Sequence, residues 1–259
     1  MIPLRDDNPT TSPPIVTLAL IAACTAVFLA QGHGDEVIDK VTARFAMVPA
    51  RVFGGDVTLT VPISAYRAIE VRLPPAAVPE WGTLLTCTFL HGSWLHLIGN
   101  MWVLWIFGDN VEERFGKLRY LLFYLLSGVL ASATHLLLQP SSQVPTVGAS
   151  GAIAGVMGAY LLLYPHARVL TLIPLGFILQ MVVVPAWVFL GLWFLLQVFG
   201  TLGGDGVGGV AWWAHIGGFV AGLVFAALLR NHHRLRGKPQ VITLTARRLG
   251  GPRRHDPWP

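Results

Sequence analysis

Six apolar stretches, most of them close to 20 residues long, run through this chain of 259 residues. A helix needs about 20 mainly apolar residues to cross the hydrocarbon core of a bilayer. The stretches cover residues 14–31, 93–111, 118–138, 150–164, 183–200 and 210–230. Only 12% of the residues are charged, against roughly 25% in soluble domains, so the chain cannot cover a water-facing surface. We therefore expect an all-α, polytopic membrane protein with a bundle of six transmembrane helices.

The basic residues predict how this bundle is oriented. Connections between membrane helices that carry an excess of Lys and Arg lie on the cytoplasmic side. With six spans, 13 of the 18 basic residues fall on the side that also holds both termini. We therefore expect a cytoplasmic N-terminal tail at 1–13, a membrane domain at 14–230 and a basic cytoplasmic tail at 231–259. The chain is expected in a cell membrane, with the bilayer as its partner and no nucleic acid.

The first two connections raise separate questions. Residues 14–31 could be mistaken for a cleaved signal peptide, but Arg5 is followed by two acidic residues and further spans come after. We therefore expect this stretch to remain as a helix. Residues 32–80 form a long segment that mixes apolar, charged, Pro and Gly residues. We interpret it as a structured or interfacial external loop.

Polar side chains inside the predicted spans are costly in lipid, so they indicate a functional site. One group is His91, His96 and Asn100, of which the last two are spaced i, i+4 and share a helix face. A second is the run Gly148-Ala-Ser150-Gly151, where a short span begins abruptly. The third is His215 in the last span.

These residue types fit nucleophilic catalysis. A serine hydroxyl becomes a useful nucleophile when a base removes its proton, and imidazole suits that role near neutral pH. The oxyanion that then develops needs aligned donors. Ser150 at a helix start can offer its backbone N–H, and His96 and Asn100 can offer side-chain donors.

Small residues near Ser150 and His215 predict that the two spans pack closely. Gly151 and Gly155 follow Ser150, and Gly218 and Gly222 follow His215 at +3 and +7. Small faces allow membrane helices to approach each other closely. A hydrogen bond between serine and histidine, at about 2.6–3.2 Å, requires such an approach.

The three polar runs together resemble the signature of the rhomboid intramembrane serine proteases. The matching segments are residues 91–100, residues 148–151 and the run Ala214-His215-Ile-Gly-Gly218, in the order usual for that family. The segment Phe107-Gly-Asp-Asn-Val-Glu112 is also similar. The resemblance covers about residues 81–229.

The resemblance implies an intramembrane serine endopeptidase with a Ser–His dyad and an acyl-enzyme intermediate. Ser150 would attack the scissile carbonyl, and His215 would act as the general base. Asn100, His96 and the Ser150 backbone N–H would form the oxyanion hole, in a cavity open to the external side. Substrates would be single-span membrane proteins, and neither a metal nor an organic cofactor is implied. His91, Gly148, Gly151 and Gly218 are interpreted as structural residues near the site.

Two positions depart from the family pattern. Many members carry Trp-Arg in the first loop, where this chain has Trp81-Gly82. Many also carry an aromatic residue four positions after the serine, stacked on the base histidine, where this chain has Ala154. We expect the orientation of His215 to come from Trp212, Trp213 or Met157 instead.

Other functions compete with this interpretation. A catalytically silent rhomboid-like protein that binds client membrane helices is the main alternative. A zinc protease lacks its His-Glu-x-x-His motif. An aspartyl protease would need two carboxylates inside spans, whereas Asp205 lies in a Gly-rich loop and Asp109 and Glu112 lie at the cytoplasmic end of the second span. A transporter should show internal symmetry, which the sequence does not. The sequence specifies neither the natural substrate nor the oligomeric state.

Overall fold

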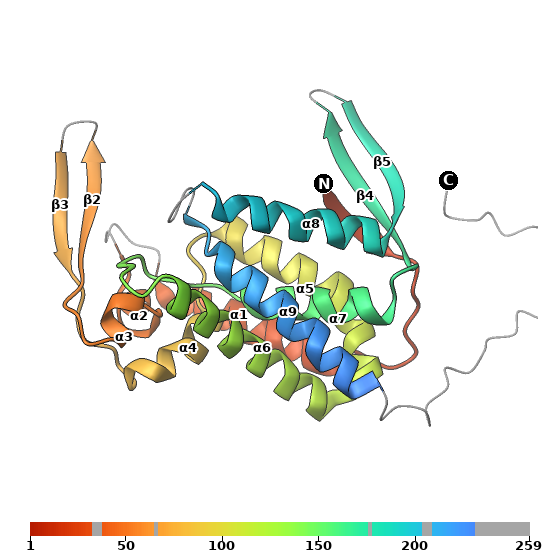
Figure 1. Cartoon of the computed structure of the whole chain (residues 1–259), viewed down its shortest axis with the longest axis horizontal. Coiled ribbons are helices and arrows are strands. Elements are labelled where there is room, and N and C mark those ends of the chain that lie inside the picture. Colours follow the sequence, from red (N-terminus) through yellow and green to blue (C-terminus); the bar gives the residue numbers. More distant parts are fainter. Residues whose placement is uncertain (33–37, 65–66, 176–177, 204–208, 231–259) are drawn as a thin grey trace, which may run out of the picture.

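In the computed structural model, which describes residues 1–32, 38–64, 67–175, 178–203 and 209–230, six long helices pack side by side (Figure 1). Each contains most of one apolar stretch. They are α1 (Ile15–Gln31), α5 (Trp94–Phe115), α6 (Lys117–Leu138), α7 (Ser150–Leu163), α8 (Ala186–Thr201) and α9 (Trp212–Arg230). In this described part, α6 and α9 are long and apolar enough to cross a membrane, and α1, α7 and α8 are apolar but shorter.

Helix α1 begins against a carboxylate from α5. The Glu112 carboxylate accepts hydrogen bonds from the backbone N–H of Val16 and Thr17, at 3.0 and 2.8 Å, and from the Thr17 hydroxyl at 2.8 Å. The first N–H groups of a helix have no partner within the helix, and the helix dipole favours a negative charge there. Glu112, at 2% exposure, therefore caps α1 and joins it to α5.

Helices α7 and α9 meet backbone to backbone. A Cβ added at Gly222 would lie 1.9 Å from the carbonyl oxygen of Gly155, and one at Gly218 would lie 2.0 Å from that of Gly151. No side chain fits at these distances, so glycine is required on this face of α9. The close approach predicted from the small residues is present.

The prediction of an all-α chain is wrong for two segments. The first is a three-stranded antiparallel sheet of β1 (Ile2–Asp6), β4 (Arg168–Leu175) and β5 (Ile178–Pro185), in the order β1-β4-β5. The segment 168–185 is rich in Val and contains Pro174 and Pro185, which favours strands over a helix interior. Helix α8 consequently starts at Ala186, three residues later than the predicted span.

The second strand pair lies in the predicted first loop. Strands β2 (Thr58–Ser64) and β3 (Arg67–Arg72) form an antiparallel hairpin, and the short helices α2 (Lys40–Phe45), α3 (Pro49–Val52) and α4 (Thr83–Thr86) flank it. The buried Arg51 guanidinium pairs with Glu80 at 3.0 Å and donates to the carbonyl oxygens of Ala43 and Ala46. This one side chain ties separate parts of the loop together.

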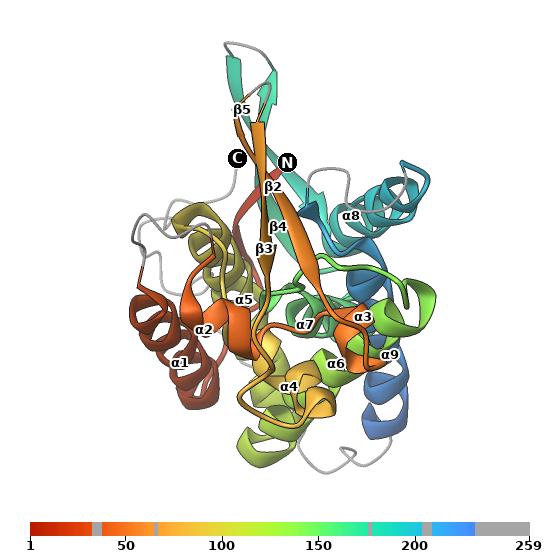
Figure 2. The ribbon, with the colours of Figure 1, turned by 90° about the vertical axis from the view of Figure 1, so that its left-hand side faces the viewer.

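The two hairpins lie at opposite ends of the bundle (Figure 1). The β2–β3 pair stands at the end where α2, α3 and α4 gather. The β4–β5 pair stands at the other end, beside the N-terminus. Seen along the bundle, both hairpins project to the same side (Figure 2). The predicted tail at 231–259 and Asp205 lie outside the described residues, whereas residues 1–13, predicted as a tail, contribute strand β1.

Candidate active site

A turn held by glycine places Ser150 at the first position of α7. Gly148 has a φ of +123°, a conformation that residues with a side chain rarely adopt. Its backbone N–H donates to the Cys87 carbonyl oxygen at 2.9 Å, which anchors the turn. A Cβ at Gly148 would also lie 2.8 Å from Nε2 of His96, so there is no space for a side chain. Gly148 therefore permits both the turn and the close approach of α5.

His215 lies in the first turn of α9, beside the start of α7. Its Nε2 atom is 2.8 Å from the Ser150 hydroxyl oxygen. The contact between α7 and α9 brings the two together, and Gly151 and Gly218 both belong to this contact. The structure thus joins Ser150 of α7 to His215 of α9 by a hydrogen bond, although the two residues are 65 positions apart in the sequence.

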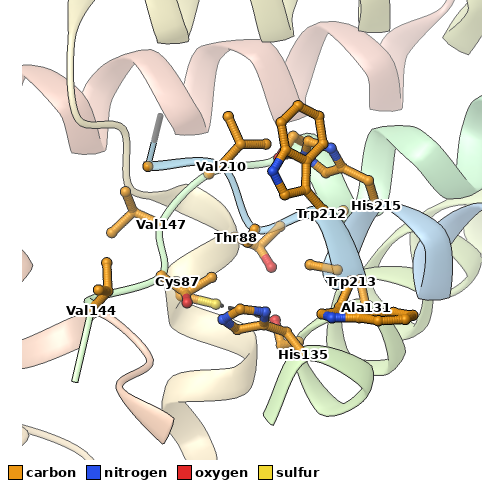
Figure 3. A pocket seen from close by; sticks show the side chains of 18 of the residues that line it. Cys87, Thr88, Ala131, His135, Val144, Val147, Val210, Trp212, Trp213 and His215 are labelled. Atoms are coloured by element: carbon orange, nitrogen blue, oxygen red, sulfur yellow. Dashed lines mark hydrogen bonds between the residues drawn. The ribbon is translucent and has the colours of Figure 1, made fainter. Parts of the chain in front are cut away.

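The pair opens into a cavity of about 500 Å³. Trp212 and His215 lie together on one side of it in Figure 3, and Val144 and Val147 lie on another. Thr88, His135 and Trp213 also line the space (Figure 3). The sequence-predicted residues on its walls are His96, Asn100, Gly148, Ser150, Gly151, Trp212, Trp213 and His215.

Two side-chain nitrogens of α5 lie close to the Gly148 turn before Ser150, since a Cβ at Gly148 would lie 2.8 Å from His96 Nε2 and 3.6 Å from Asn100 Nδ2. The Asn100 Nδ2 atom is buried and has no hydrogen-bond partner among the described residues. The His96 ring lies against Gly148, and the Ser150 N–H belongs to the first turn of α7. A buried amide without an acceptor is costly unless a ligand supplies one. This arrangement suits an anion or a polarised carbonyl oxygen.

His91 is fixed through its backbone. Its N–H donates to the Gln31 side chain, and its carbonyl oxygen accepts from the same amide, both at 3.0 Å. We interpreted His91 as a structural residue near the site. Its ring is buried and contacts His96 edge to face, with centroids 5.2 Å apart.

One of the three side chains predicted to orient His215 contacts its ring. Trp212 contacts its ring edge to face at 6.3 Å, as one of the predicted options, whereas Met157 is buried in the core and Trp213 lines the cavity. Two residues of α8 were missed. Gln197 Oε1 lies 2.8 Å from His215 Nδ1, and the Trp193 ring lies 5.8 Å from the imidazole.

A signal for Gln197 existed in the sequence. It is the one strongly polar residue in the interior of the apolar run 183–200, and it follows Trp193 by four positions on the same helix face. In the described part of the chain, no group of three His, Cys, Asp or Glu residues could hold a metal ion.

Comparisons with known proteins identify the family of this chain. A rhomboid domain profile matches residues 78–232, which is more than half of the chain. The chloroplastic Rhomboid-like protein 11 of Arabidopsis thaliana is 35% identical over 156 residues, covering 58% of this chain and 53% of that protein. The Rhomboid protease GluP of Bacillus subtilis (strain 168) is 33% identical over 175 residues, covering 68% and 31%.

A third relative comes from a distant organism. Rhomboid-like protease 5 of Toxoplasma gondii is 34% identical over 156 residues, covering 57% of this chain and 16% of that protein. The chain thus spans about half or less of the length of these relatives. The matched region contains every residue that we placed around the cavity. With its mostly helical fold and the domain match, the chain belongs to the rhomboid family of membrane proteins.

Proposed function

We propose that this protein is an intramembrane serine endopeptidase that acts through a dyad of Ser150 and His215. The observation that carries the proposal is the 2.8 Å contact between the Ser150 hydroxyl and His215 Nε2, at the wall of a cavity. A nucleophile within hydrogen-bond reach of its base is the arrangement that acyl transfer requires. Relatives named as proteases add support.

In the acylation step, His215 Nε2 takes the hydroxyl proton as Ser150 Oγ attacks the carbonyl carbon of the scissile peptide. The negative charge moves to the carbonyl oxygen, where the donors of Asn100, His96 and the Ser150 backbone stabilise it. The tetrahedral intermediate then collapses. The C–N bond breaks, and the leaving amine receives the proton from His215.

Deacylation repeats these steps with water. His215 takes a proton from a water molecule, the resulting oxygen attacks the ester carbon, and Ser150 recovers its proton as the acid product leaves. The cavity of about 500 Å³ has room for that water beside the dyad. Each step thus uses a residue that lines the same space.

The proposed setting is a cell membrane crossed six times, with both termini in the cytoplasm and the cavity open to the external side. The 13 basic residues on the side of the termini support this orientation. The substrates would be single-span membrane proteins, because such helices can reach the site laterally. Helix α8 would gate this access.

The test compares the parent protein with Ser150→Ala and His215→Ala in liposomes. A fluorophosphonate probe should label the parent and not Ser150→Ala, and both variants should fail to cleave a model transmembrane substrate. Ser141→Ala is a matched control, since Ser141 is exposed in the loop between α6 and α7 and is not among the residues that line the cavity, and it should behave as the parent does.

The alternative is a silent relative that binds client helices without cutting them. It predicts no probe labelling and no cleavage by the parent, with the substrate still retained. Full activity in Ser150→Ala or His215→Ala would refute the dyad.

A further inference from the structure

We propose that Gln197 is the positioning residue of His215, holding the imidazole in the tautomer that can accept the Ser150 proton. This inference rests on the proposed function and assigns a third side chain to the site. In the family resemblance the base is oriented by an aromatic residue at the position of Ala154, which here is a buried methyl group. Helix α8 supplies the missing orientation.

Helix α8 places the amide with little freedom. Gln197 is 5% exposed in a helix that is otherwise apolar along its buried face. Burying an amide without hydrogen bonds destabilises the folded state. The hydrogen bonds that the Gln197 amide makes therefore determine its orientation. Both ends of the amide have partners.

The hydrogen bonds assign the two ends of the amide. Gln197 Nε2 lies 2.7 Å from the Trp193 carbonyl oxygen, which can only accept, so the NH₂ group must point there. The carbonyl end, Oε1, therefore faces His215 Nδ1 at 2.8 Å. An amide oxygen can only accept, so His215 Nδ1 must carry the hydrogen.

The tautomer of the base follows from this assignment. A neutral imidazole carries one ring hydrogen, so with Nδ1 protonated, Nε2 presents its lone pair to the Ser150 hydroxyl 2.8 Å away. This is the form that can accept the serine proton. Once Nε2 is protonated, the Nδ1–H bond to Gln197 persists, so the amide dipole also stabilises the imidazolium.

The amide acts like the carboxylate of a serine-protease triad but without its charge. A carboxylate orients the histidine and also attracts the imidazolium. An amide orients it and adds only a dipole, which avoids burying an ion in lipid. Trp193, one helical turn before Gln197, packs on the imidazole with an interplanar angle of 35°. Orientation therefore comes from α8 through both a ring contact and a hydrogen bond.

Two substitutions separate positioning from packing. Gln197→Met keeps the length and approximate volume of the side chain but cannot accept the Nδ1 hydrogen bond. We expect kcat to fall on the order of 10–100-fold, with KM within about twofold and an unchanged Tm in detergent. Gln197→Glu restores an acceptor. It should recover at least about tenfold of that loss and move the acid limb of the kcat/KM profile to higher pH, because the carboxylate favours the imidazolium.

The control is Leu195→Ala, an exposed position on the same helix, which should leave kcat and the pH profile unchanged. Ser150→Ala is measured in parallel. If Ser150→Ala is inactive and Gln197→Met keeps the parent kcat and pH profile, the positioning role is overturned while the protease proposal stands. The positioning role would also be overturned if kcat fell equally in Gln197→Met and Gln197→Glu and both variants had a lower Tm than the parent.

A measurement that needs no catalytic activity tests the role of Gln197 separately from the proposed protease function. In Ser150→Ala protein labelled with ¹⁵N-histidine, the His215 ring signals are assigned by their loss in a His215→Asn variant. We expect the Nδ1–H tautomer when Gln197 is present and a mixture of tautomers in Gln197→Met. The same tautomer distribution in both proteins would refute the assignment, whatever activity the parent shows.

Discussion

Helix α9 packs against α7 through its backbone and against α8 through side chains, and the candidate site uses both contacts. On the α7 side, carbonyl oxygens occupy the space where side chains of Gly218 and Gly222 would be. On the α8 side, the Phe194 and Phe219 rings stack at 4.6 Å, and Gly200 packs against the Trp212 ring. Rings can change rotamer while their helices remain folded, whereas carbonyl groups within a helix cannot move independently.

The difference assigns separate tasks to the two contacts. Ser150 and His215 lie on the pair whose separation is fixed, so their 2.8 Å distance survives small movements of the bundle. Gln197 lies on the helix held by side chains. A shift of α8 would therefore alter the orientation of the base before it altered the distance between nucleophile and base.

The largest effect is expected from a substitution that disrupts the backbone contact between α7 and α9. Gly222→Ala places a methyl group 1.9 Å from the Gly155 carbonyl oxygen, so the two helices must separate. We expect the free energy of unfolding to fall by about 3 kcal/mol, the upper end of the usual cost of overpacking, and no detectable cleavage. The control is Gly191→Ala on α8, where a Cβ would meet no atom within 4 Å. Unfolding in detergent measures both, and equal midpoints would disprove the contrast.

A smaller effect is expected when the oxyanion donors are reduced without moving the helices. Asn100→Ala removes the unpartnered amide of α5 and should lower kcat by about 10²–10³-fold with the Tm preserved. Ile98→Ala, at a position on α5 with 56% exposure, is the control and should retain the parent kcat. An unaltered kcat in Asn100→Ala would remove this residue from the proposed oxyanion hole.

Removing the aromatic contact between α8 and His215 should lower kcat less than removing the Asn100 amide does. Trp193→Leu removes the ring that packs on His215 but keeps the backbone carbonyl that holds the Gln197 amide. One aromatic contact contributes about 0.5–1.5 kcal/mol, so we expect kcat to fall by roughly 2–13-fold. Steady-state kinetics on the same transmembrane substrate would show this. A loss larger than that of Gln197→Met would mean that the ring, and not the amide, dominates the orientation.

The smallest effect concerns the end of α7 far from Ser150. The pKa of Asp6 is raised to about 6, mainly by burial. A hydrogen bond from Tyr160 lowers this pKa, and the nearby Asp109 and Asp7 carboxylates raise it. Because the pKa of the folded state exceeds the ordinary value of 3.8, the stabilisation from protonated Asp6 is complete below pH 3.8 and is lost as the pH rises through 6.

Thermal unfolding at pH 5 and pH 7 tests this linkage. The parent should lose more stability between these values than Asp6→Asn, which stays neutral and can keep the contacts with Tyr160 and Asn110. The same pH dependence in both proteins would exclude Asp6 as its source.

Some of these features were predictable from the sequence and others were not. The close approach of α7 and α9 was predictable from glycines at helical spacing, because small residues on facing helices allow their backbones to come close together. The six apolar runs located the long helices. The strands at 168–185 were missed because a short apolar run has no period that distinguishes a buried helix from a strand.

The contacts of His215 show a different limit. A sequence can mark Gln197 as an unusual polar residue in a span, but the rotation of α8 decides which neighbour it meets. The same holds for His91. Its ring turns towards His96, and only the packing of α5 against the turn at Gly148 determines that direction.

The pairing of β1 with β4 has a consequence for how the chain is made. Ile2 lies opposite Leu172, so the first strand leaves the ribosome long before its partner has been synthesised. In the meantime the sequences of α1, α5, α6 and α7 all emerge and can reach the bilayer. The Asp7–Arg168 ion pair must likewise wait for the later segment. This end of the bundle can therefore close only after the β4 segment has emerged, and a nascent chain stalled before residue 168 would have residues 2–6 without their strand partner.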